Sequence, residues 1–297
     1  MSLRLRLLNA ILPYTERRFL EKETDPKKVR KSFDFKARLL FRAPRGTQSS
    51  EISLANVPCL RVHSNLTKPP ATLFFIHGGG YIFGNAQSYE GLAARLGLAA
   101  GIDVVLPDYR LAPEHAFPAA VDDVIAAYRA LCIKHPNRKI ILGGDSAGGG
   151  LALAVLAATL AAGLPKPVLT VLLSPFTDMT YSGASVQENA AKEVLLPVSR
   201  INDLQQMYLQ GADPTDLRAS PLWADFTGSG PVAIYVGTTE ILRDDSTRLA
   251  ERLSAQGVEV DLFLRPNAPH VWPFMAPILP EGRQDITRIG AQIRAVL

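Results

Sequence analysis

The 297-residue chain has few cysteines and no metal-ligand pattern. Its two cysteines, Cys59 and Cys132, form neither a C-x-x-C pair nor a metal-like spacing. A disulfide-stabilised secreted scaffold is therefore excluded, and free thiols in a reducing compartment, the cytoplasm, are expected. None of the five histidines has a second ligand at metal spacing, so we expect neither a metal nor a cofactor.

Long hydrophobic runs are also missing. No segment reaches the roughly 18 apolar residues that a transmembrane helix requires. The apolar piece 7–12, which follows a charged start, is too short for a secretory signal, is interrupted by Asn9 and leads into Pro13. The sequence therefore predicts a protein that is neither secreted nor stably inserted in a membrane.

Positive charge is concentrated at the start of the chain. Residues 1–45 carry 13 Lys and Arg against 5 Asp and Glu, a local charge of +8, whereas residues 46–297 carry 19 against 23. A basic arm of this kind can meet nucleic acid or anionic lipid. The arm has no nucleic-acid-binding motif, so we expect no nucleic-acid partner and interpret it as an amphipathic helix that covers an active site.

What remains is the composition of a globular domain, with 47% hydrophobic and 20% charged residues. Apolar runs typical of buried strands alternate with segments of helical periodicity, which indicates a mostly parallel sheet with helices on both faces. The expected strands are 35–41, 57–63, 72–76, 103–107, 139–143, 168–173, 231–236 and 258–264. The expected helices lie near 88–100, 119–134, 147–162, 198–210, 246–256 and 284–296.

A serine stands at a turn between an apolar strand and a helix. Residues 144–148 read Gly-Asp-Ser-Ala-Gly and follow the apolar run 139–142. A tight strand-to-helix turn leaves little room beside the serine, so Gly144 and Gly148 flank it, and the helix N-terminus favours developing negative charge. Ser146 is therefore the candidate nucleophile.

Three consecutive glycines follow the apolar run 72–76 and a histidine. Their backbone N–H groups are not shielded by side chains and can stabilise an oxyanion. An ordinary turn needs one glycine rather than three. We expect the N–H groups of Gly78, Gly79 and Ala147 to form an oxyanion hole.

An acid and a histidine follow two later strands. Glu240 and Asp244 come after the run 231–236, and His270 comes after 258–264. A parallel sheet presents its working residues at the carboxyl ends of its strands. The order serine, acid, histidine is that of the α/β-hydrolases, so these residues predict nucleophilic acyl transfer.

The motifs resemble those of the hormone-sensitive-lipase-like esterases, also called bacterial family IV, of the α/β-hydrolase superfamily. The resemblance covers the chain from residue 35 onward and rests on 77–80, 108–114, 144–149 and His270. It implies an α/β-hydrolase fold with an eight-stranded sheet and a helical cap. It also implies a serine carboxylesterase for small acyl esters of short to medium chain length. Homodimers are common in the family, although nothing in this sequence requires one.

Two parts of the chain supply the expected cap. Residues 1–45 form an N-terminal arm, and an insertion at about 177–215 interrupts the catalytic domain 46–297. Within the insertion, Met207 and Tyr208 are candidates to line an acyl pocket, or to pack the core of the cap itself.

The acid position departs from the family pattern. Family members usually show Asp-x-Leu-x-Asp there, whereas this chain has Glu240-Ile-Leu-Arg-Asp244. Glutamate is an accepted triad acid in this fold, so Glu240 is the predicted partner of His270 and Asp244 is the alternative.

Two other functions use the same scaffold. One is a non-catalytic small-molecule-binding protein, which the presence of a serine, an acid and a histidine disfavours. The other is an amidase or deacetylase, which shares the catalytic machinery and differs from an esterase in pocket shape.

Overall fold

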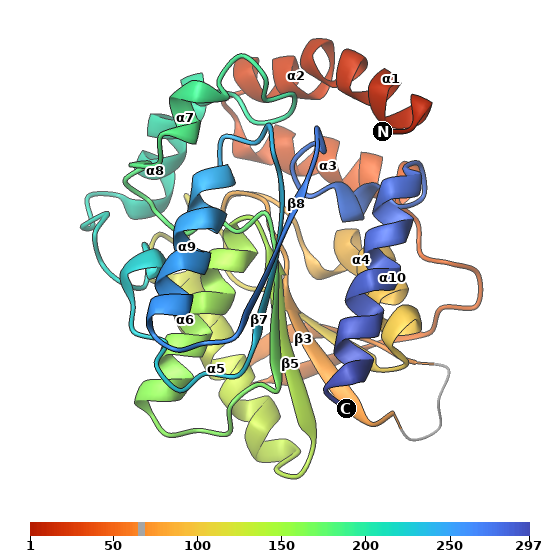
Figure 1. Ribbon diagram of the computed structural model, residues 1–297, viewed down its shortest axis with the longest axis vertical. Coiled ribbons are helices and arrows are strands. Elements are labelled where there is room, and N and C mark those ends of the chain that lie inside the picture. Colours follow the sequence, from red (N-terminus) through yellow and green to blue (C-terminus); the bar gives the residue numbers. More distant parts are fainter. Residues whose placement is uncertain (65–68) are drawn as a thin grey trace.

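One sheet organises the computed structural model, which describes residues 1–64 and 69–297 (Figure 1). In this described part, eight strands are hydrogen-bonded in the order β1-β2-β4-β3-β5-β6-β7-β8. The β1–β2 and β2–β4 pairs are antiparallel, and the other pairs are parallel. The strands are β1 (Ser49–Leu54), β2 (Val57–Val62), β3 (Ala71–Ile76), β4 (Asp103–Pro107), β5 (Lys139–Asp145), β6 (Leu169–Leu173), β7 (Val232–Gly237) and β8 (Val260–Arg265).

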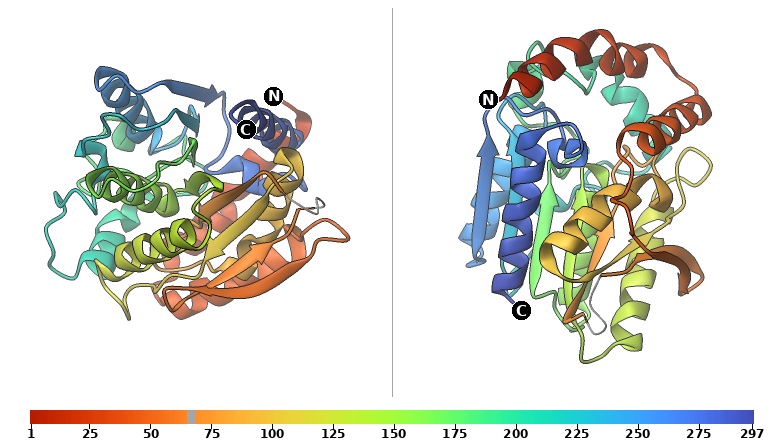
Figure 2. Two further views of the ribbon diagram at one scale, coloured as in Figure 1. Left: turned by 90° about the horizontal axis from the view of Figure 1, so that it is seen from below. Right: turned by 90° about the vertical axis from the view of Figure 1, so that its right-hand side faces the viewer.

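Helices cover both faces of the sheet (Figures 1 and 2). One face carries α4 (Ala86–Ala100) and α10 (Pro280–Ala295). The other face carries α5 (Ala119–Lys134), α6 (Ala147–Ala161) and α9 (Arg243–Ala255). The expected mostly parallel sheet between two helical layers is confirmed.

Strand β3 shows why two layers are needed. Leu73 and Phe75 belong to the core under α4 and α10, whereas Phe74 and Ile76 belong to the core on the other side. Successive side chains of a strand point to opposite faces, so a strand that is apolar throughout must be covered twice.

The expected strand 35–41 is wrong. Most of it belongs to α3 (Pro26–Leu40), and the first strand is β1. The side chain of Asp25 caps α3 by accepting a hydrogen bond from the Lys27 N–H, and a proline stands at the first helical position. The short alternation of apolar and polar residues resembled a strand, but the cap and the one-sided burial favour a helix.

Further helices lie beyond the carboxyl ends of the strands (Figures 1 and 2). They are α1 (Leu3–Ile11), α2 (Glu16–Lys22) and α3 from the N-terminal arm, and α7 (Ser185–Glu188) and α8 (Ile201–Leu209) between β6 and β7. The helix expected at 198–210 is α8, and the short α7 was not among the expected helices. No helix within residues 1–64 and 69–297 is both long and apolar enough to cross a bilayer.

Candidate active site

Ser146 occupies a strained turn between β5 and α6. Its backbone has φ 51° and ψ −123°, a conformation that residues with side chains rarely adopt. A Cβ on Gly144 would collide with the carbonyl of Gly148, and a Cβ on Gly148 would collide with the carbonyl of Ile76. The two glycines therefore permit the close approach of β3, β5 and α6 that holds Ser146 at the end of the sheet.

Glu240 and His270 follow β7 and β8, and their side chains are in contact. His270 Nδ1 lies 2.6 Å from Glu240 Oε2, so the ring donates a hydrogen bond to the carboxylate. The other carboxylate oxygen, Oε1, accepts hydrogen bonds from Ser174 Oγ at 2.8 Å and from the Gly237 N–H at 2.5 Å. These three donors hold the buried Glu240 carboxylate in one orientation.

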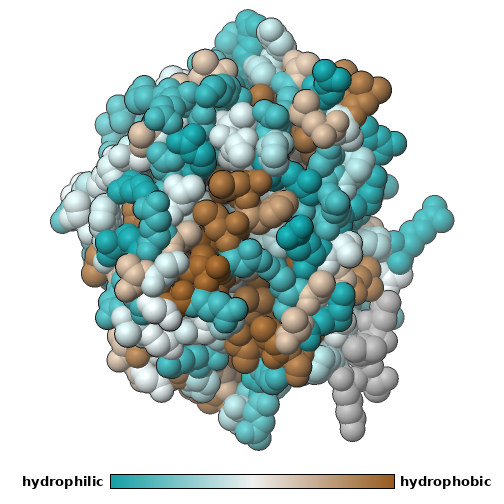
Figure 3. Space-filling model, viewed as in Figure 1, coloured by the Kyte–Doolittle hydropathy of each residue, from teal (hydrophilic) through white to brown (hydrophobic). Residues whose placement is uncertain are grey.

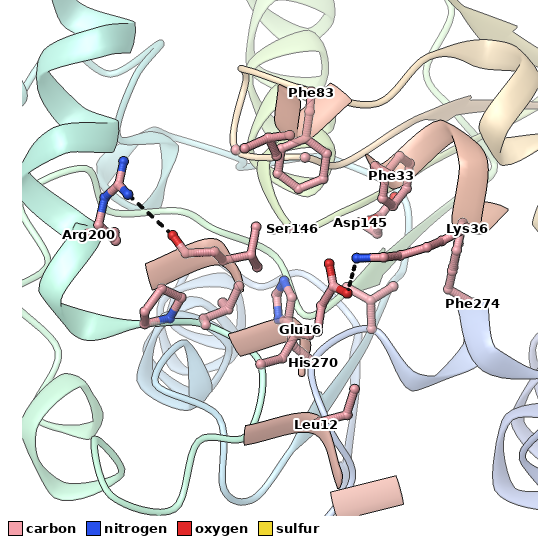
Figure 4. Close-up of a pocket in the computed structure, with 18 of the residues that line it drawn as sticks. Leu12, Glu16, Phe33, Lys36, Phe83, Asp145, Ser146, Arg200, His270 and Phe274 are labelled. Carbon is pink, nitrogen blue, oxygen red and sulfur yellow. Dashed lines mark hydrogen bonds and ion pairs between the residues drawn. The ribbon is translucent and has the colours of Figure 1, made fainter. Parts of the chain in front are cut away.

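The second ring nitrogen of His270 is available. Ser146, Asp145 and His270 line one cavity (Figure 4). Among the described residues, no hydrogen-bond partner reaches the buried His270 Nε2. Burial opposes protonation of the ring, but the charge of Glu240 and the hydrogen bond to it outweigh burial and raise the His270 pKa. The imidazole is thus oriented by a carboxylate, and its unpartnered nitrogen belongs to a residue that lines the same cavity as Ser146.

Asp244, the alternative acid, lies elsewhere. It stands in the first turn of α9, where its Oδ2 accepts from the Ser185 N–H at 2.8 Å and its Oδ1 accepts from Arg243 Nε at 2.8 Å. The contact with Ser185 attaches α7 to α9. The structure therefore pairs His270 with Glu240 and leaves Asp244 in a supporting contact.

The glycine loop departs from the expectation in one residue. The Gly78 N–H donates to Asp145 Oδ1 at 2.9 Å, so Gly78 is not a free oxyanion donor and that expectation is wrong. Gly79 and Gly80 line the cavity with φ of 110° and 58°, and within residues 1–64 and 69–297 their N–H groups have no acceptor. Ala147 is the first residue of α6, so its N–H has no partner within the helix. Sequence reasoning missed Gly80, although the third glycine of the run was the signal.

His77 braces this loop. It is fully buried, its Nδ1 lies 2.8 Å from the Gly78 carbonyl, and its ring stacks on Tyr109 at 4.3 Å. The Tyr109 hydroxyl also donates to the His77 carbonyl at 2.8 Å. The backbone before the glycines is thereby fixed from two sides.

Asp145 ties the glycine loop to the serine turn. Besides the Gly78 N–H, its carboxyl group accepts a hydrogen bond from the Tyr89 hydroxyl at 3.0 Å. Burial raises the pKa of Asp145 to about 7. The residue orders the turn through these contacts.

Glu193 is a buried carboxyl group that sequence reasoning missed. Its Oε1 accepts from the Leu195 N–H at 2.8 Å, and its Oε2 accepts from the Ile241 N–H at 3.1 Å, next to Glu240. Burial, and then the negative charge of Glu240, raise the Glu193 pKa, and the charge of Glu193 in turn contributes to raising the His270 pKa. No motif marks this residue, because the contact to Ile241 joins positions 48 residues apart.

The cavity beside Ser146 has a volume of about 510 Å³ and a mostly apolar lining. The N-terminal arm and the insertion both contribute to it, through Leu12, Leu20, Phe33, Leu196, Leu204 and Met207. Tyr208 does not line it but stacks on Tyr81 at 3.8 Å. Figure 4 shows the ion pair of Glu16 and Lys36, 2.5 Å long, in the cavity wall. Such a lining suits an apolar group of a small substrate.

Comparison with known proteins agrees with this geometry. A profile of the α/β-hydrolase fold family matches residues 73–274. An acetyl-hydrolase of Streptomyces hygroscopicus is 42% identical over 224 residues, which are 75% of each chain. An ethyl acetate hydrolase of Pseudomonas putida is 31% identical over 81% of this chain and 80% of its own.

Solved structures give the same answer. A crystal structure of an esterase from the bacterial hormone-sensitive lipase family superposes with a TM-score of 0.92 at 36% identity, covering 99% of this chain and 98% of that one. The chain therefore belongs to the α/β-hydrolase family, and within it to the hormone-sensitive-lipase-like esterases. The expected fold, family and enzyme class, a carboxylic ester hydrolase, are confirmed.

Proposed function

We propose that this protein hydrolyses short- to medium-chain acyl esters with Ser146 as nucleophile, His270 as general base and Glu240 as the acid that orients it. The observation that carries the proposal is the Glu240–His270 hydrogen bond, which leaves Nε2 without a partner in a residue that lines the same cavity as Ser146. A neutral imidazole with Nδ1–H held by a carboxylate is the form that can accept a hydroxyl proton.

The reaction has two acyl-transfer steps. Ser146 Oγ bonds to the carbonyl carbon while its proton passes to His270 Nε2. The N–H groups of Gly79, Gly80 and Ala147 bind the resulting oxyanion, each donor worth on the order of 3 kcal/mol in the transition state. The C–O bond then breaks and His270 protonates the departing alcohol. Water, deprotonated by His270, attacks the acyl-enzyme, and collapse of the second oxyanion releases the carboxylic acid and returns the proton to Ser146.

The substrate range follows from the size of the cavity and from the relatives. About 510 Å³ of largely apolar space accommodates a medium acyl chain. One relative is named acetyl-hydrolase and another ethyl acetate hydrolase. The N-terminal arm 1–45 and the insertion at about 177–215 form the cap over the domain 46–297 in this proposal. Cys59 and Cys132 are buried free thiols, which supports a cytoplasmic location.

The test replaces the nucleophile. Ser146→Ala should abolish hydrolysis of p-nitrophenyl esters across a series of acyl lengths, and should prevent labelling by a serine-directed phosphonate. Ser254→Ala, at an exposed position of α9, is the matched control and should behave as the wild type. Turnover by a folded Ser146→Ala variant at the wild-type rate would refute the assignment.

A further inference from the structure

The outward face of α1 carries apolar side chains that the fold leaves uncovered. Leu3 is 79% exposed, Leu7 60% and Ile11 45%, at the spacing of one helix face. Leu5 and Leu12 are buried on the opposite side and already anchor the helix. Apolar surface is visible at the upper right of Figure 3, where α1 lies in Figure 1.

Basic side chains lie on the next helix of the arm, α2. Tyr14, which is 77% exposed, borders a surface hollow together with Arg18 and Lys22. Within residues 1–64 and 69–297, neither of these two cations has a carboxylate at ion-pair distance. The acidic residue at the same hollow, Glu23, is paired with Lys28 at 3.6 Å.

We propose that the docking face, defined as Leu3, Leu7, Tyr14, Arg18 and Lys22, adsorbs to an anionic lipid surface. Exposed apolar side chains beside unpaired cations are the combination that lies in the headgroup region of such a surface without spanning it. An exposed tyrosine suits the same boundary, because its ring is apolar and its hydroxyl is polar.

A second copy of the chain is a poorer occupant. A two-fold contact would bring the same cations of the two copies together. The apolar side chains offer on the order of a few hundred Å², below the roughly 800 Å² per partner of a standard interface. An anionic bilayer supplies the opposite charge and has no such area requirement.

The docking face is continuous with the active-site cavity. Ile11 is exposed beside Leu7 and also lines the cavity, as does Leu40, which is 46% exposed. An ester dissolved in the lipid surface would therefore meet the cavity from the adsorbed side. This consequence rests on the proposed esterase function, whereas adsorption itself does not.

The experiment is vesicle flotation of the full chain. Vesicles of phosphatidylcholine alone are compared with vesicles that also contain phosphatidylglycerol, at low and high salt. We expect binding to the anionic vesicles and loss of binding at high salt. Arg18→Gln with Lys22→Gln should weaken it about 30-fold, at about fivefold per cation. Leu3→Glu with Leu7→Glu should weaken it at least as much. Equal binding to both vesicle types, or none to the anionic ones, overturns the proposal.

Matched controls lie on α5, away from the arm (Figure 1). Ile133 is 77% exposed, so Ile133→Glu makes the same change as Leu3→Glu on another surface, and Arg129→Gln with Lys134→Gln matches the cation pair. These controls should bind as the wild type does. Unchanged vesicle binding by the docking-face variants overturns the proposal. It is also overturned if the wild type binds no vesicles but forms a dimer that these substitutions dissociate.

Hydrolysis separates the two proposals. The docking-face variants should hydrolyse a water-soluble ester at the wild-type rate, and an ester embedded in anionic vesicles more slowly. Ser146→Ala should float with anionic vesicles as the wild type does while hydrolysing neither ester. A failure of adsorption is thereby distinguishable from a failure of catalysis.

Discussion

Replacement of Glu240 by glutamine tests the proton arrangement of the triad. In the wild type, Glu240 Oε1 accepts two hydrogen bonds, from Ser174 Oγ and from the Gly237 N–H, and Oε2 accepts one from His270. A glutamine has one acceptor oxygen, and we expect it to face the two donors, Ser174 Oγ and the Gly237 N–H. Its NH₂ group then faces His270 Nδ1, which must accept instead of donate.

The expected magnitude follows from this reversal. If Nδ1 accepts, the ring proton moves to Nε2, which is the atom that must receive the proton of Ser146. A base held in the wrong tautomer costs about 10⁴-fold in serine proteases, or about 5 kcal/mol of transition-state stabilisation. We expect a loss of kcat/KM of that order for Glu240→Gln. Asp244→Asn keeps the acceptor for the Ser185 N–H and should cost less than about tenfold.

The assay is the steady-state hydrolysis of a chromogenic short-chain ester by both variants, with circular dichroism to establish that each is folded. The rates are compared at pH values above the acid limb of the wild-type profile, because His270 is then unprotonated in the wild type. Glu240→Gln activity within tenfold of the wild type, or a larger loss for Asp244→Asn, would refute the tautomer argument.

Two further predictions concern buried carboxyl groups. Activity should fall as the pH falls through the pKa of His270, which is raised above 6.5. Glu193→Gln removes a nearby negative charge and should therefore move this acid limb of the kcat/KM profile to lower pH. An acid limb at the same pH in the variant would contradict the electrostatic role of Glu193. Burial raises the pKa of Asp145 from its ordinary value of 3.8 to about 7, so the native state binds an extra proton between these pH values and loses stability as the pH rises. As the pH rises through that window, the stability of Asp145→Asn relative to the wild type should therefore increase by up to about 1.4 kcal/mol per pH unit. The free energies of unfolding of both proteins are compared by urea denaturation at pH 5 and pH 7. A stability difference that does not change with pH would contradict the prediction.

Features encoded over short stretches were predictable from the sequence. The serine turn needs two glycines within five residues. The strand before Glu240 is a continuous apolar run, and the strand before His270 begins with alternating apolar and acidic residues. Local chemistry therefore located the candidate residues, since each motif contains its own physical cause. The helix 119–134 was predicted with the bounds that the structure has, because its apolar periodicity is regular.

Features that depend on contacts between distant segments were not predictable. Gly78 and Gly79 look alike in sequence, and only the position of Asp145 shows that the Gly78 N–H is engaged. The role of Glu193 cannot be predicted from its neighbours in sequence, because it depends on the contact between the insertion and the turn after β7. In α3, the cap at Asp25 was a local signal that outweighs the short alternation read as a strand.

The position of the strands in the sheet has a thermal consequence. The nucleophile follows β5 in the interior, whereas the base follows β8, which in the described part of the chain pairs with β7 alone. Marginal elements open at lower free energy than central ones. On gentle warming, we expect β8 to open and the His270 ring to leave its position while the other strands stay paired. On cooling, the ring should return. We therefore expect activity to be lost, as the edge strand β8 opens, at a lower temperature than the one at which the whole protein unfolds.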